Sequence, residues 1–150
     1  MRKIVSTNTT KRKLNQWLDR ISKPNKKLDG LPICPYIANF RDNIHITVVK
    51  DPARLARHFA DVKDIFRLEA CVATGFWMSY NKLDKMVDEL NQELAIKDVV
   101  VLMMHPDGDE SVLPVDYQFD LPLLIIQRLS TLEKARAELS KTNYYKHYKY

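Results

Sequence analysis

The sequence has few glycines and cysteines and no long apolar segment, and each shortage excludes a class of protein. Only three glycines are present, so the chain has neither a G-x-G-x-x-G nor a Walker-type phosphate-binding loop. Cys34 and Cys71 are too few for a disulfide framework and too far apart for a C-x-x-C motif. The longest apolar runs, 99–104 and 121–126, are far shorter than the roughly 20 residues that cross a bilayer.

Sequence motifs of common enzymes and of secretion are also missing. The chain contains no G-x-S-x-G and no H-E-x-x-H, so the common hydrolase classes have no support. No apolar stretch follows the basic first residues, as it would in a secretory signal. We therefore expect a cytoplasmic protein with reduced thiols. A phage or metagenomic source is a hypothesis only.

The net charge of +5 is unevenly distributed. Residues 1–27 hold nine Lys and Arg against one Asp, and residues 141–150 add three Lys, whereas residues 28–140 hold twelve Lys and Arg against eighteen Asp and Glu. The basic ends could bind phosphates, with the tail tyrosines stacking on bases. The alternative is a solvated helix face and a partly ordered tail. We expect weak nucleic-acid binding at most and no membrane partner. The sequence leaves the oligomeric state open.

The length and the 45% hydrophobic content predict one α/β domain over residues 1–150. An apolar stripe at positions 14, 17, 18 and 21 predicts a basic amphipathic helix over about 9–22. Patterning further predicts strands at 44–49, 70–76, 99–104 and 123–129, and helices from Asp51-Pro52, over 79–94, and from a capping box at 130–133 through Leu139. A basic aromatic tail, 143–150, follows.

The order of these elements predicts the sheet. A β-α-β-α-β middle favours parallel strands, with 99–104 in the centre because it is apolar throughout. The fourth strand follows without a helix, so we expect it to pair antiparallel. The fold predicted is a mixed, mostly parallel four-stranded sheet with flanking helices.

Cys34 is the first candidate for a catalytic residue. It stands between Pro32 and Pro35, and Pro35 suits the first position of a helix. Cys34 would then be the N-cap, where the helix dipole favours a thiolate and lowers the thiol pKa. The alternative is a small buried hydrophobe beside a proline turn.

His105 and Asp107 are the other catalytic candidates. They follow the apolar strand 99–104, and ligands of open α/β sheets gather at the carboxyl ends of strands. His105 could act as a base for Cys34 or join Asp107 and Asp109 at a metal ion, although no second His stands at i+2 or i+4, so we assign no metal site. The alternative is a histidine that caps a turn.

Three further residues are candidates for substrate binding, namely Tyr36, Tyr80 and Asn81. Tyr80 and Asn81 precede the clearest helix, where Tyr80 could supply a hydroxyl to a cleft. Helix capping by Asn81 explains the same pair without a substrate.

Several of these segments share a pattern with a known family. The segment Gly30 to Tyr36, the start Tyr80-Asn81 with Leu83-Asp84, the pair His105-Pro106, and the segment from Pro122 to Ser130 resemble domain-of-unknown-function family 1415. Its members have similar G-L-N-L-C-P-F-A, Y-N-x-F-L-D and F-H-P segments in the same order. The resemblance implies that Cys34 and His105 belong to a shared pattern. It implies no activity and no cofactor.

Two classes of function follow from the sequence. One is a small thiol- or metal-dependent enzyme built on Cys34, His105 and Asp107. The other is a non-catalytic binding or accessory protein, for which nucleic acid or a partner chain is a possible ligand. The sequence assigns no cofactor and leaves open whether the chain is an enzyme.

Overall fold

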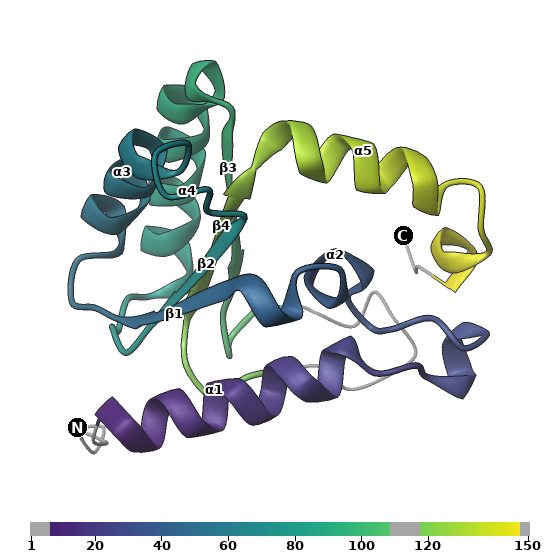
Figure 1. The fold of residues 1–150 in the computed structure, drawn as a ribbon. Coiled ribbons are helices and arrows are strands. Elements are labelled where there is room, and N and C mark those ends of the chain that lie inside the picture. Colours follow the sequence, from purple (N-terminus) through teal and green to yellow (C-terminus); the bar gives the residue numbers. More distant parts are fainter. Residues whose placement is uncertain (1–6, 109–117, 148–150) are drawn as a thin grey trace.

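A computed structural model describes residues 7–108 and 118–147. From residue 35 to residue 104, α-helices and strands alternate along the chain (Figure 1). The α-helices are α1 (Thr7–Ser22), α2 (Pro35–Ala38), α3 (Pro52–Val62), α4 (Tyr80–Leu94) and α5 (Leu129–Leu139). The strands are β1 (Ile44–Val48), β2 (Ala70–Thr74), β3 (Val99–Met104) and β4 (Leu123–Arg128). Short 3-10 turns cover Lys26–Leu28 (η1), Arg41–Asn43 (η2), Ala95–Lys97 (η3) and Tyr144–His147 (η4).

The four strands form one mixed sheet in the order β1-β2-β4-β3. The α/β class and the antiparallel fourth strand are confirmed, but the expectation of mostly parallel pairing is wrong. Only β1 and β2 pair in parallel, whereas β4 pairs antiparallel with both β2 and β3. The reason is the position of β4, which inserts between two strands that run in the same direction.

β3 is an edge strand, not the central strand that its apolar sequence predicted. Its residues are apolar throughout because both faces are covered. Val99 and Val101 are buried against α4, and Leu102 and Met104 pack against the cluster on the opposite face. A continuous apolar run therefore indicates that other elements cover both faces of the strand, and it does not indicate whether the strand is central or at the edge of its sheet.

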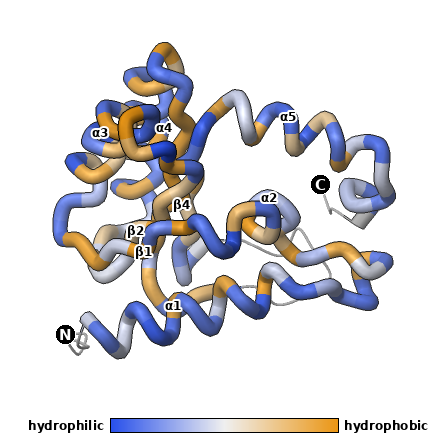
Figure 2. Tube along the Cα trace, in the orientation of Figure 1, coloured by the Kyte–Doolittle hydropathy of each residue, from blue (hydrophilic) through white to orange (hydrophobic). Residues whose placement is uncertain are grey.

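Helices cover the two faces of the sheet in separate groups (Figure 1). On one face, α3 and α4 pack on the sheet through Phe59, Leu83 and Leu90. On the other face, α1 buries the stripe that the sequence predicted, and apolar bands recur along it (Figure 2). α3 begins after Asp51, as expected, and Asp51 caps it by accepting from the Arg54 N–H, whereas Ser79 rather than Asn81 caps α4.

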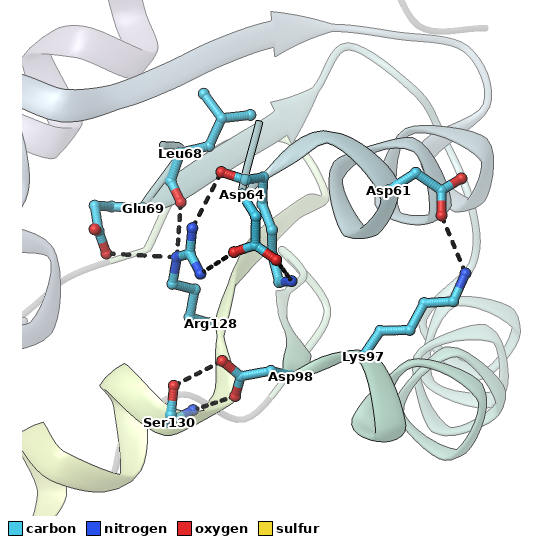
Figure 3. Close-up of polar contacts among 9 residues, drawn as sticks. Asp61, Asp64, Leu68, Glu69, Lys97, Asp98, Arg128 and Ser130 are labelled. Atoms are coloured by element: carbon cyan, nitrogen blue, oxygen red, sulfur yellow. Dashed lines mark hydrogen bonds and ion pairs between the residues drawn. The ribbon is translucent and has the colours of Figure 1, made fainter. Parts of the chain in front are cut away.

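α5 is fixed to the sheet at its first turn by residues from elsewhere in the chain (Figure 3). The expected capping box at 130–133 is wrong, because α5 begins at Leu129 and Ser130 lies inside it. Asp98 provides the cap instead, accepting from both the N–H and the hydroxyl of Ser130 at 2.7 Å. Arg128, just before α5, donates to Asp64 and to the carbonyls of Lys63 and Leu68. These contacts set the direction in which α5 leaves the sheet.

Candidate functional site

His105 follows β3 and is buried, with 2% of its surface exposed. The Asp107 N–H donates to Nδ1 at 3.0 Å, so Nδ1 carries no proton. Nε2 lies 2.7 Å from the carbonyl oxygen of Met78, to which it therefore donates. These contacts correspond to the Nε2–H tautomer, and both ring nitrogens take part in joining the end of β3 to the segment before α4.

Aromatic side chains surround the His105 ring. The Trp77 ring centroid lies 5.2 Å away, and the Tyr80 ring meets it edge-on at 5.8 Å. The Asp107 carboxylate is exposed and lies 3.9 Å from Nδ1, which accepts a hydrogen bond and so forms no ion pair with it. The structure therefore brings together three of the predicted site residues, His105, Asp107 and Tyr80.

Cys34 is the N-cap of α2, directly before Pro35, as the sequence predicted. The predicted activation of its thiol is wrong. Burial raises the pKa of Cys34 to about 11, and the smaller opposing effect of the Ile37 and Tyr36 backbone amides does not offset it. α2 has only four residues, and the Cys34 side chain forms no capping hydrogen bond. Cys71, inside β2, also has a pKa raised by burial, so neither cysteine has the depressed pKa of a reactive thiol.

Cys34 lines a cavity with a volume of about 910 Å³. β3 contributes residues from both of its faces to the lining, Val101 and Met103 on one and Leu102 and Met104 on the other, and β4 contributes Ile125. The other lining residues come from α1, the segment 33–37, α4, α5 and the C-terminal turn η4. Most of the lining is apolar, with polar groups from Cys34, Tyr36, Tyr144, Tyr145, Asn91 and Arg136.

The C-terminal turn η4 closes one side of this cavity. Tyr144 is buried and donates its hydroxyl hydrogen to the Ile33 carbonyl oxygen at 2.7 Å. Tyr145 meets the Tyr144 ring edge-on, and its hydroxyl is hydrogen-bonded to the hydroxyl of Tyr36. These tail tyrosines therefore contact the segment around α2, and Figure 1 shows the chain returning to α2 after α5.

The predicted site residues thus fall into two groups. His105, Asp107 and Tyr80 lie where the segment before α4 meets the end of β3, and Cys34 and Tyr36 line the cavity. No hydrogen bond joins Cys34 to His105 within the described residues, and Asn81 is exposed in the first turn of α4. No three His, Cys, Asp or Glu side chains in 7–108 and 118–147 gather closely enough to hold a metal ion. Asp109 lies outside the described residues.

Sequence reasoning missed most of the cavity residues, Arg136 above all. The signal for Arg136 was present, because it falls on the same face of its helix as Leu132 and Leu139 at spacings of four and three residues. A cation on an apolar stripe is a feature that a pattern search can detect. The rest of the lining comes from segments far apart in the sequence, which no local pattern connects.

Comparisons with known proteins add no information on the fold or the candidate site of this chain. No protein-family model, no curated protein and no solved structure matches it. The resemblance to family 1415 accordingly stays a prediction, and so does the cytoplasmic location. In the described part of the chain, every helix is too short or too polar to cross a membrane.

Proposed function

We propose that this chain is a binding protein that takes a small apolar molecule into the cavity beside β3. The observation that carries the proposal is the cavity itself, with a volume of about 910 Å³ and a mostly apolar lining. Pockets that hold small molecules measure roughly 300–1,000 Å³ and combine apolar walls with a few polar groups. The cavity has both properties.

The chemistry of the side chains favours binding over thiol catalysis. The raised pKa of Cys34 leaves little thiolate at neutral pH, and thiolate is the nucleophilic form. The one ring nitrogen of His105 that could accept a proton already accepts from the Asp107 N–H. For His105 to act as a general base, the hydrogen bond from the Asp107 N–H to Nδ1 would first have to break.

The test is the binding of a neutral apolar dye, Nile red, to the native protein and to two variants of one position. Cys34→Phe places a ring where the thiol lines the cavity, and Cys34→Ala keeps the space and removes the sulfur. We expect saturable dye binding by the native protein and by Cys34→Ala, and a loss of at least tenfold in affinity for Cys34→Phe. Circular dichroism reports whether each variant folds.

A second measurement does not depend on the folding of a variant. In protein labelled with ¹³C at the methionine methyl groups, Met104 lines the cavity, whereas Met86 packs in the cluster beneath α3 and α4 and is not part of the cavity lining. We expect added dye to shift the Met104 signal and to leave that of Met86 unchanged. A native protein that binds no dye, or dye that shifts Met86 and not Met104, would overturn the proposed function.

A further inference from the structure

α5 carries a cation on the face that it turns toward the cavity. Leu132, Arg136 and Leu139 follow one another at i, i+4 and i+7, so they share one face of the helix. Leu132 and Leu139 are 1% and 8% exposed, while Arg136 is exposed and lines the cavity. The guanidinium of Arg136 therefore lies between Leu132 and Leu139, on the otherwise apolar face of α5.

Arg136 forms no ion pair with a carboxylate of the described residues, in contrast to three arginines that do. Arg41 pairs with Asp19, Arg57 with Glu93, and Arg128 with Asp64. Within residues 7–108 and 118–147, no carboxylate forms an ion pair with Arg136. The nearby Glu138 is 3.7 Å from Lys141 instead. The lining of the cavity thus includes a cation that makes no ion pair with a carboxylate of the described residues.

We propose that the molecule in the cavity is amphipathic, with an apolar tail and an anionic head that Arg136 binds. This inference rests on the proposed function. The planar guanidinium donates two parallel hydrogen bonds to a carboxylate or a phosphate, which gives it both affinity and orientation toward such heads. The tail lies over Leu102, Met104 and Ile125, where the lining is apolar.

The experiment compares three ligands that share one tail, namely decanoate, decyl phosphate and 1-decanol. Their dissociation constants are measured by calorimetry, below the concentrations at which they aggregate, with the native protein and two variants. Arg136→Gln removes the cation at the cavity. Lys134→Gln, the matched control, removes an exposed cation from another face of the same helix.

We expect the native protein to bind at least one anionic ligand about tenfold or more tightly than 1-decanol, as hydrogen bonds to charged groups imply. Arg136→Gln should lose this preference and keep its affinity for 1-decanol, while Lys134→Gln should retain both. The preference should weaken as salt rises, because the pair is reached by solvent. Whether decanoate or decyl phosphate binds more tightly identifies the head.

The outcomes separate this inference from the function on which it rests. Equal binding of decanol and both anions by the native protein would overturn the anionic head and leave the apolar binding function standing. The same holds if Arg136→Gln keeps the preference, or if Lys134→Gln loses it equally. If no ligand with this tail binds and Nile red also fails to bind, the proposed function itself is wrong.

Discussion

Cys34 shows how one residue can satisfy a local pattern and still have a different chemistry. Its place before Pro35 is the N-cap that the sequence predicted, but a single turn of helix offers a weak dipole. Cys34 packs against the apolar cluster that contains Ile21, Ile33 and Ile37. Removal from water disfavours the thiolate more than the nearby amides favour it, so the thiol pKa rises to about 11.

The raised pKa predicts how Cys34 reacts with an alkylating reagent. In a Cys71→Ser variant, the rate of reaction with N-ethylmaleimide should rise about tenfold for each pH unit between pH 7 and pH 10, because the thiolate fraction rises tenfold per unit below the pKa. Mass spectrometry of timed samples gives the rate. A rate that levels off near pH 8 would mean an activated thiol, and would restore the enzyme hypothesis.

Cys71 provides the comparison at the same scale. It is 5% exposed inside β2, whereas Cys34 is partly exposed on the cavity wall. Access should therefore make Cys34 the faster of the two to react, although burial raises both pKa values. Faster labelling of Cys71 in the Cys34→Ser variant, relative to Cys34 in Cys71→Ser, would contradict this view of the cavity.

At the scale of elements, β3 is an edge strand whose outer groups are partly satisfied by a side chain. The Asn91 amide on α4 donates to the Val101 carbonyl at 3.0 Å and accepts from the Val101 N–H at 2.7 Å. One asparagine thus supplies both hydrogen bonds that a neighbouring strand would make with Val101. This protects the edge from pairing with a strand of another chain.

Replacing Asn91 should destabilise the protein through this edge. In Asn91→Ala, the buried N–H and C=O of Val101 lose their partners, which costs about 1–3 kcal/mol in free energy of unfolding. The control is Gln92→Ala, which removes an exposed amide from the next position of α4. Urea unfolding measures the difference, and sedimentation measures self-association at the opened edge. Equal stability of the two variants would show that Asn91 does not protect β3.

Local patterns predicted the elements well but not their arrangement. The α1 stripe, the Asp51-Pro52 start of α3 and the antiparallel direction of β4 are confirmed, because each depends on residues near one another in the sequence. The position of β4 between β2 and β3 depends on contacts across the chain, and so does the cap that Asp98 gives to α5. The cavity belongs to this second kind, since its lining comes from both ends and the middle of the chain.

On the scale of the whole molecule, the first helix α1 and the C-terminal turn η4 line the same cavity. Trp17 and Ile21 of α1 line it from the N-terminal side, and Tyr144 and Tyr145 line it from the C-terminal side. Arg128 and Asp98 hold the first turn of α5, which carries the chain out from the sheet (Figure 3). Binding in the cavity should therefore stabilise the N- and C-terminal segments together.

The distribution of charge at this scale limits any affinity for nucleic acid. The basic side chains of Lys11, Arg12 and Lys13 are exposed on α1, but residues 28–140 carry an excess of acids that repel phosphates. Tyr144, a candidate for stacking on bases, is buried and bonded to the Ile33 carbonyl. We therefore expect only weak binding to DNA, without sequence preference.

A salt titration with labelled duplex DNA tests this expectation. Binding should be detectable at low salt and lost near physiological salt, with a log–log slope of about −0.9 for each phosphate neutralised. Combined substitution of Lys11, Arg12 and Lys13 by Gln should weaken it and make the slope shallower. Substituting Lys82, Lys85 and Lys134 removes the same number of exposed cations from α4 and α5 and should change little, because acids of the same region already compensate them. Sequence-selective binding that survives physiological salt, or equal loss in both triple variants, would mean that a surface other than α1 binds the nucleic acid.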